Sequence, residues 1–326
     1  MKALIYVDRY LEILELIERY VRITTAYLEE QGHYVSVCSD LECGVREVED
    51  ADIVLCWAFP EELLSAAKRL KWIQFGSAGI DHTLFPKLVE SEIILTTLSG
   101  VHQVPVAEHT MALILSLRRG IHTAMEQQLR AEWQRAPISE PVGELSGMTI
   151  GIVGLGKIGL EIARLAKCFN MRVIGTKKTV TGDIPNVDEA LPPSGLHKAL
   201  RNADVLVLVS PLTEATRALI GEKELDMMKP GSYIVNVARG QMIDHDALIE
   251  KLKSGHISGA GLDVFPQEPL PPGDPLWRAP NIIITPHTAG STPHYPERAA
   301  EIFKKNLDAF ISGEPMVNVY DRQRGY

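Results

Sequence analysis

The sequence predicts an α/β protein whose parallel sheets are built from repeated β-α-β units. Short runs of apolar and β-branched residues alternate with longer helix-like patterns along the chain, and this alternation is typical of parallel sheets. A cluster of glycines follows one such run at residues 154–159. Polar side chains follow several others, at the strand ends where an open α/β sheet binds its ligand. We therefore expect two successive parallel-sheet regions, joined by a helix.

The first region begins with a predicted strand and a long predicted helix. Its strands are expected at residues 3–7, 34–39, 53–57, 72–75 and 91–98, and its helices at residues 10–31 and 61–69. Gly32 is expected to end the first helix, because glycine easily adopts the left-handed conformation found there. The small residues at 76–82, beyond the fourth strand, form either a loop whose N–H groups bind an anion or a plain turn.

A mostly apolar helix is predicted at residues 104–119. Because it has so little polar surface, we expect it to be buried between domains or between subunits. Glu108 and His109 inside it are interpreted as a structural pair rather than as ligands or catalysts, since polar groups in a packed helix normally find partners. The turn-forming residues at 131–147, which include Trp133, predict an excursion from the core.

The glycine cluster lies between a predicted strand at 148–153 and a predicted helix at 160–171. Gly154 permits a tight turn, Gly156 lets the backbone approach a pyrophosphate, and Gly159 lets helix and strand pack closely. The free N–H groups at the start of a helix favour phosphates. A glycine-rich turn alone is a weak signal, but between a strand and a helix it predicts a dinucleotide site.

The expected end of the next strand carries lysines in place of an acid. An acidic side chain about 20 residues beyond the glycines normally binds the ribose of NAD, whereas this sequence has Thr176, Lys177 and Lys178. Lysines supply the counter-charge that a 2′-phosphate needs, so we predict NADP as the cofactor, with NAD as the alternative. The other interpretation is that two surface lysines simply follow a strand.

Three polar residues lie at or just past the ends of later strands, which are predicted at residues 205–209, 232–237, 257–264 and 282–285. They are Arg239, Glu268 and His287. A guanidinium binds a carboxylate in bidentate fashion, an imidazolium donates a proton to a developing alkoxide, and a nearby carboxylate keeps that imidazolium charged and oriented. Taken one at a time, Arg239 could equally be a surface cation, Glu268 a turn residue and His287 a helix cap. Behind a dinucleotide motif, they predict hydride transfer to a 2-oxo acid.

Composition sets wider bounds. With 326 residues, 45% hydrophobic and 23% charged, the chain suits two domains, and its net charge of −9 argues against general nucleic-acid binding. No run reaches the roughly 20 apolar residues of a membrane span, and no signal peptide is recognisable, so we expect a cytoplasmic protein with no membrane partner. Four cysteines without metal-ligand spacing predict no metal site and free thiols: Cys38, Cys43, Cys56 and Cys168.

Several of these segments resemble signatures of the D-isomer-specific 2-hydroxyacid dehydrogenase family. The clearest are residues 236–240, 263–269 and 285–290, and others are similar at 106–110, at 154–159 and at Pro211 to Thr213 with Thr216. The resemblance implies two Rossmann-like or flavodoxin-like domains with the active site in the cleft between them. Residues 1–103 and 290–326 would form a discontinuous substrate-binding domain, and residues 104–289 the dinucleotide-binding domain. A homodimer with the helix from Val104 at the contact is also implied, and Trp133 of a neighbouring subunit would help to line the substrate pocket.

The resemblance also implies individual roles. Arg239 would bind the substrate carboxylate and carbonyl, His287 would be the acid in reduction and the base in oxidation, and Glu268 would be its partner. The N–H groups at Ser77, Ala78 and Gly79 would hold the carboxylate, and Asp263 would hold the carboxamide side of the nicotinamide. The implied cofactor-binding set is Gly154, Gly156, Lys157, Ile158, Gly159, Thr176, Lys177, Lys178, Ser210, Pro211, Thr216, Val237, Ala238, Asp263, His287, Ala289 and Gly290.

Other functions on the same scaffold stay open at this point. The main hypothesis is an NADP-preferring reductase of a small 2-oxo acid, with glyoxylate, hydroxypyruvate or a branched 2-oxo acid as candidates. A second is a cofactor-sensing binding protein, like the corepressor relatives of the family. A third is a formate or phosphite dehydrogenase, although formate enzymes carry Gln where this chain has Glu268.

Overall fold

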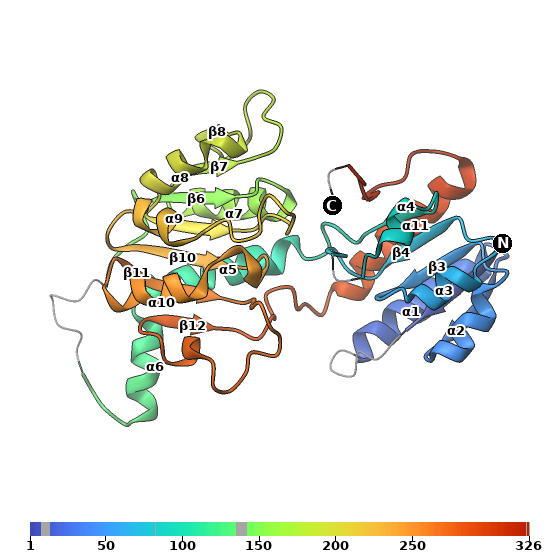
Figure 1. Cartoon of the computed structure of the whole chain (residues 1–326), viewed down its shortest axis with the longest axis horizontal. Coiled ribbons are helices and arrows are strands. Elements are labelled where there is room, and N and C mark those ends of the chain that lie inside the picture. Colours follow the sequence, from blue (N-terminus) through green and yellow to red (C-terminus); the bar gives the residue numbers. More distant parts are fainter. Residues whose placement is uncertain (8–13, 82, 135–141, 324, 326) are drawn as a thin grey trace. The chain divides into compact units, whose positions relative to one another are not determined.

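The computed structural model describes residues 1–7, 14–81, 83–134, 142–323 and 325 (Figure 1). The chain divides into two compact units: unit 1 is Met1–His102 with Ser291–Tyr326, and unit 2 is Gln103–Gly290. The predicted helix start at residues 10–13, His82, and residues 135–141 of the predicted excursion lie outside the described residues.

Unit 1 holds a five-stranded parallel sheet in the order β2-β1-β3-β4-β5. Its strands are β1 (Lys2–Tyr6), β2 (Tyr34–Cys38), β3 (Ile53–Cys56), β4 (Trp72–Phe75) and β5 (Ile94–Thr96). Its helices are α1 (Leu14–Glu30), α2 (Leu41–Val48), α3 (Glu61–Ala66), α4 (Pro86–Glu90) and α11 (Tyr295–Ser312). One core joins the sheet to α1 and α11 and includes Tyr20 and Phe303, and a second joins it to α2, α3 and α4 and includes Leu63 and Leu88. A sheet covered on both faces explains why β3 and β4 are buried along their whole length, whereas β2, at the edge of the sheet, is partly exposed.

Two of the four cysteines form a disulfide, so the prediction of four free thiols was wrong. Cys38 ends β2 and Cys43 lies in the first turn of α2, where Asp40 caps the helix by accepting from the Cys43 N–H. The cap turns the chain sharply and brings the two Cα atoms to 5.6 Å, which is a normal separation for a disulfide. Cys56 and Cys168 are free.

Unit 2 holds a seven-stranded parallel sheet in the order β12-β11-β10-β9-β6-β7-β8. Its strands are β6 (Thr149–Val153), β7 (Arg172–Thr176), β8 (Glu189–Leu191), β9 (Val205–Leu208), β10 (Ser232–Asn236), β11 (Ile257–Leu262) and β12 (Ile282–Ile284). Its helices are α5 (Gln103–Arg118), α6 (Ile121–Leu129), α7 (Lys157–Cys168), α8 (Leu196–Asn202), α9 (Glu222–Met227) and α10 (His245–Lys253). The strand order reverses between β6 and β9, and such a switch point is where doubly wound sheets bind their ligands.

The apolar helix α5 is buried within unit 2 over much of its length, which agrees with its apolar composition. Its buried residues join the core formed with β6, β9, β10 and α7. Gly259 and Gly261 of β11 leave the room this needs, since a Cβ on them would lie 3.0 Å from the Leu117 side chain and 3.1 Å from the Leu113 side chain. The expectation that α5 is buried was correct, and its expected place at a contact between domains or subunits stays a prediction.

Candidate active site

The glycine turn follows β6 and fits closely against its neighbours. Gly154 has φ +113°, and a Cβ there would lie 2.8 Å from the Ser210 backbone. A Cβ on Gly159 would lie 2.0 Å from the Gly154 carbonyl oxygen. These two positions therefore accept only glycine, the first for its conformation and the second for the close approach of α7 to the turn.

Gly156 is glycine for a different reason. Its backbone is extended (φ −88°, ψ −164°), and a Cβ would meet nothing within 4 Å. The open space lies where α7 begins, and the residue at the N-cap, Gly156, has no side chain to cap the helix. Uncapped N–H groups and the positive end of the helix dipole suit a pyrophosphate. Lys157 and Ile158 form the first turn of α7, so the turn fits a dinucleotide.

The end of β7 lies directly beside the turn, because the Leu155 N–H donates to the Thr176 carbonyl at 2.9 Å. Thr176 is buried, whereas Lys177 and Lys178 after it are exposed. The Lys177 N–H donates to Leu191 of β8, which fixes the backbone where the strand ends. The structure thus places cations where an NAD-specific site carries an acid.

The loop after β9 completes this edge of the sheet. Ser210 packs against Gly154 as described, and Pro211 follows it. The Thr216 hydroxyl donates to the Pro211 carbonyl at 2.8 Å and accepts from the Thr213 N–H at 2.8 Å. In this structure Thr216 therefore shapes the loop, and its predicted contact with the cofactor stays a prediction.

Arg239 lies in the loop after β10, and the buried side chain of Asn236 organises this loop. Its amide donates to the Arg239 carbonyl at 2.9 Å and accepts from the Ala238 N–H at 3.0 Å. A Cβ on Gly240 would lie 2.0 Å from the Phe265 backbone, so the Arg239 loop lies against the turn that leads to Glu268. Asn236 was not among the predicted site residues, although its position at the end of a buried strand could have indicated it.

Glu268 and His287 form the pair that the sequence predicted. The Nδ1 atom of His287 lies 2.6 Å from a Glu268 carboxylate oxygen. The other carboxylate oxygen accepts from the Phe265 N–H at 2.9 Å, so the carboxylate is held from both sides. The ring of a second histidine, His245, meets the Phe265 ring edge-on. Burial lowers the pKa of His245, so the neutral form of this imidazole is favoured. The side chain of His287 is 52% exposed, which leaves its other nitrogen open to a substrate.

Asp263 holds the backbone of the loop that carries His287. Its carboxylate is buried and accepts from the Thr288 N–H at 2.9 Å, the Ala289 N–H at 3.0 Å and the Thr285 hydroxyl at 2.6 Å. Its carbonyl accepts from the His287 N–H at 2.9 Å. His287 itself has φ +54°, which a residue with a side chain rarely adopts. The predicted role of Asp263 toward the nicotinamide stays a prediction beside this observed one.

Within the described part of the chain, no hydrogen bond joins Glu108 to His109, and their interpretation as structural residues stays a prediction. Glu108 is exposed, whereas His109 is part-buried and its Nε2 lies 3.0 Å from the Thr285 hydroxyl. Adjacent residues of a helix point in directions about 100° apart, so they rarely contact each other. Neither Thr285 nor the connection of His109 to the His287 loop is among the features predicted from the sequence.

In unit 1, the loop after β4 carries the predicted carboxylate-binding residues. The Ser77 hydroxyl donates to the Gly79 carbonyl at 3.0 Å, and the Ser77 carbonyl accepts from Leu98 at 2.9 Å. Within the described part of the chain, the backbone N–H groups of Ser77, Ala78 and Gly79 donate to no protein acceptor. This loop is therefore fixed in shape and has donors available for an anion.

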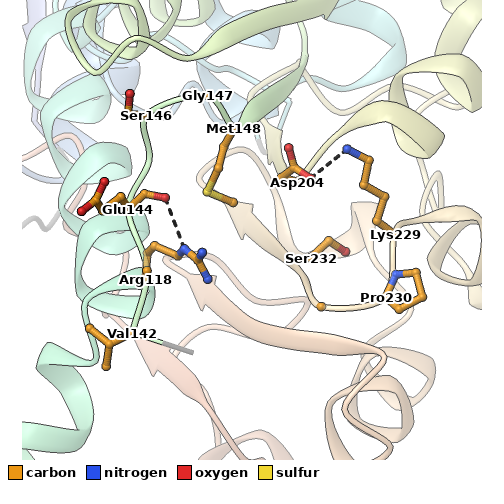
Figure 2. A pocket seen from close by; sticks show the side chains of 12 residues that line it. Arg118, Val142, Glu144, Ser146, Gly147, Met148, Asp204, Lys229, Pro230 and Ser232 are labelled. Carbon is orange, nitrogen blue, oxygen red and sulfur yellow. Dashed lines mark hydrogen bonds and ion pairs between the residues drawn. The ribbon is translucent and has the colours of Figure 1, made fainter. Parts of the chain in front are cut away.

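A separate hollow of about 700 Å³ lies at the opposite, amino-terminal end of the unit 2 sheet. Figure 2 shows Lys229 paired with Asp204 at 2.8 Å and Arg118 donating to the Glu144 carbonyl at 3.4 Å. Its lining therefore mixes both signs of charge, and it contains none of the predicted site residues. Among the described residues, no His, Cys, Asp and Glu cluster could hold a metal ion, and no helix is long and apolar enough to cross a membrane.

Comparison with known proteins agrees with this geometry. Residues 111–289 match the family model for the NAD-binding domain of D-isomer specific 2-hydroxyacid dehydrogenases. A glyoxylate reductase from Thermofilum pendens is 36% identical over 275 residues, 83% of this chain and 81% of that protein. One from Aeropyrum pernix is 33% identical over 317 residues, 96% and 93% of the two chains.

A solved structure extends the similarity to the whole fold. The NADPH-dependent glyoxylate/hydroxypyruvate reductase from Sinorhizobium meliloti, in complex with NADP and sulfate, superposes with a TM-score of 0.85 at 26% identity over 100% of both chains. The resemblance seen in the sequence and the two predicted parallel-sheet domains are thus confirmed. This chain belongs to the D-isomer specific 2-hydroxyacid dehydrogenase family, and it is an oxidoreductase that uses a nicotinamide dinucleotide.

Proposed function

We propose that this enzyme reduces glyoxylate or a similarly small 2-oxo acid to the D-2-hydroxy acid, with NADPH as the preferred cofactor. The observation that carries the proposal is the 2.6 Å contact between His287 and Glu268. Such a pair holds an imidazole ready to donate a proton beside a reacting carbonyl. The names of the relatives from Thermofilum pendens and Aeropyrum pernix support glyoxylate as the substrate to test first.

In this proposal, His287 protonates the oxygen of the substrate carbonyl. Because Glu268 engages Nδ1, the transferable proton belongs to Nε2, and the carboxylate stabilises the charged imidazolium. A nicotinamide cofactor, when bound, supplies the hydride. In oxidation the neutral His287 accepts the proton back from the hydroxyl group.

Arg239 and the loop at Ser77, Ala78 and Gly79 are proposed to hold the substrate carboxylate. A guanidinium matches a carboxylate in bidentate fashion and polarises the neighbouring carbonyl. The proposed role of the unit 1 loop is supported by its backbone N–H groups, which donate to no acceptor among the described residues. We propose accordingly that unit 1 is the substrate-binding domain and unit 2 the dinucleotide-binding domain.

The remaining residues of the predicted cofactor set are proposed to surround the dinucleotide at the same sheet edge. The turn from Gly154 to Gly159 holds the pyrophosphate, and Val237 and Ala238 after β10 contact the nicotinamide half. Ala289 and Gly290, after β12, are the last two residues of the proposed cofactor-binding set. Lys177 and Lys178 provide the counter-charge to a 2′-phosphate, which is the reason to prefer NADPH.

The test measures initial rates for a panel of 2-oxo acids with NADPH and with NADH, for the wild type and for Lys177→Asp. One charge-assisted hydrogen bond contributes about 1.5–3 kcal/mol, so we expect the ratio of kcat/KM for NADPH over NADH to fall about 10- to 100-fold in the variant. Lys223→Asp, at an exposed position of α9, is the matched control and should leave the ratio unchanged. An enzyme that binds NADPH but reduces none of the acids would instead favour a cofactor-sensing role.

We further propose that the enzyme is a homodimer whose contact involves α6. Ile121, Met125, Leu129 and Trp133 follow each other at intervals of four residues and are 44%, 61%, 88% and 99% exposed. The first three lie on one face of α6, and Trp133 follows the end of the helix. Such a group of exposed large apolar side chains is typical of a protein interface. A second copy of the chain is the proposed occupant, and the predicted place of Trp133 beside a neighbouring subunit stays part of this proposal. Sedimentation equilibrium of the wild type and of Leu129→Glu tests it.

A cytoplasmic location, expected from the sequence, stays a prediction. The disulfide between Cys38 and Cys43 removes one of its supports, because disulfides are rare in the cytosol of most organisms.

A further inference from the structure

The loop that carries His287 has an unusual backbone conformation and needs to be held in place. His287 adopts φ +54°, and left-handed conformations of residues with a side chain cost of order 1–3 kcal/mol when the surroundings do not compensate. The compensation comes from the buried carboxylate of Asp263, which accepts from the N–H groups of Thr288 and Ala289. The position of the imidazole therefore depends on the position of the Asp263 carboxylate.

We propose that His109 is a positioning residue that fixes this carboxylate through the hydroxyl of Thr285. Its Nε2 lies 3.0 Å from the Thr285 oxygen and 3.6 Å from the nearer Asp263 oxygen. The Thr285 oxygen in turn lies 2.6 Å from the same carboxylate oxygen. The three side chains form one chain of hydrogen bonds, from α5 to the loop after β12. This role rests on the proposed function of His287.

The direction of these hydrogen bonds follows from the hydroxyl. A threonine hydroxyl has a single proton, and that of Thr285 is donated to the Asp263 carboxylate at 2.6 Å. Toward His109 it can then only accept, so the His109 ring carries its proton on Nε2. With His109 as donor, the Thr285 oxygen accepts one hydrogen bond and donates another, so both bonds hold the Thr285 side chain in place.

The helix that supplies His109 is well placed to act as a fixed support. α5 is packed against β11 through Leu113 and Leu117, which fit over two glycines of that strand. Asp263 follows β11 directly, and Thr285 follows β12. The donor, the hydroxyl and the carboxylate thus all come from elements of one packed unit. We expect the His109 side chain to restrict the loop without contacting substrate.

The first experiment compares His109→Leu, which removes the donor at similar volume, with His109→Gln, whose amide nitrogen can replace Nε2. A displacement of about 1 Å in a catalytic group costs on the order of 100-fold, so we expect kcat of His109→Leu to fall about 10- to 100-fold while KM for the 2-oxo acid changes little. His109→Gln should recover most of that loss. Glu108→Gln, at the exposed neighbouring position of α5, is the matched control and should behave as the wild type.

Variants of Thr285 test the proposal independently, because a substitution at His109 can also perturb the packing of α5. Thr285→Val removes the hydroxyl and keeps the shape, and Thr285→Ser keeps the hydroxyl. Thr285→Val should lower kcat as His109→Leu does, and the double variant should be no worse than either single one because both break the same chain of hydrogen bonds. Additive losses, or equal losses in Leu and Gln variants at 109, would overturn the proposal.

A readout without turnover separates this inference from the proposed function. Nδ1 of His287 lies 2.6 Å from a Glu268 carboxylate oxygen. With the proton on Nδ1, as proposed, this contact should give a downfield nuclear magnetic resonance signal that is missing in His287→Ala. We expect this signal in the wild type and in His109→Gln, and its broadening or loss in His109→Leu. If the wild type reduces no 2-oxo acid, the proposed function fails, and the signal still tests the positioning role. A signal unchanged in His109→Leu would overturn that role.

Discussion

The two ends of the unit 2 sheet use their polar groups differently. At the carboxyl-terminal end, Asn236 and Asp263 are buried, and their side chains accept from or donate to the backbone of the loops that carry Arg239 and His287. At the amino-terminal end, Asp204 and Lys229 form a part-exposed pair beside a hollow of about 700 Å³. The hollow is thus at one end, and the arrangement suited to catalysis is at the other.

The difference teaches that backbone conformation locates this site better than the volume of a cavity does. At the carboxyl-terminal end His287, a residue with a side chain, has φ +54°, and its N–H donates to the Asp263 carbonyl at 2.9 Å. Buried polar side chains that fix such loops are costly unless fully bonded, so they mark a place where geometry matters. The lining of the hollow has positive φ at Gly147 and Gly231, but both are glycines, which adopt this conformation readily.

The largest expected effect tests the division of roles between the two ends. His287→Ala removes the proposed proton donor, and a missing acid–base group costs about 100- to 10,000-fold in rate. We expect kcat/KM for glyoxylate to fall within that range, measured from NADPH oxidation. Lys229→Met, at the hollow, should leave kcat/KM unchanged. A comparable loss in Lys229→Met would contradict the assignment of catalysis to the carboxyl-terminal end.

Much of the fold could be predicted because local patterns dictate it. Most strands of both sheets could be predicted because they are short runs of apolar and β-branched residues that become buried. The turn at Gly154 could be predicted because its glycines stand where the backbone leaves no room for a side chain. The pairing of Glu268 with His287 could be anticipated, because side chains after neighbouring parallel strands meet at one edge. The helices that were not predicted are short, with five to nine residues each, and they are α2, α4, α6, α8, α9 and α10; the short strand β8 was not predicted either.

What could not be predicted depends on contacts between distant residues. The packing of α5 on β11 requires Gly259 and Gly261, which look like weak points of a strand when read alone. The connection of His109 to Thr285 spans 176 residues, and no local pattern indicates it. The Cys38 to Cys43 bond depends on the turn made by the cap of α2.

A second, smaller effect concerns the glycine turn at the carboxyl-terminal end. Gly156→Ala adds a methyl group in open space, so folding should be unaffected, whereas the approach of a pyrophosphate to the backbone should be blocked. We expect the Kd for NADPH, measured by fluorescence titration, to rise roughly 10- to 100-fold. Gly221→Ala is the matched control, because Gly221 precedes α9 with a similarly extended backbone. Unchanged affinity in Gly156→Ala would argue against a phosphate site at this turn.

The smallest effect is expected at the amino-terminal end, and it concerns stability alone. The Asp204 carboxylate accepts from the Thr149 N–H at 2.7 Å and pairs with Lys229 at 2.8 Å, so it ties the start of β6 to the chain before β9 and β10. Asp204→Asn weakens the first bond and removes the ion pair, and we expect the free energy of unfolding in urea to fall by about 1–2 kcal/mol. Glu250→Gln, which breaks the exposed pair with Lys253, should change it by less than about 0.5 kcal/mol. Because the proposed catalytic groups lie at the other end of the strands, kcat/KM of Asp204→Asn should equal that of the wild type, and a selective loss of activity there would show that the two ends are coupled.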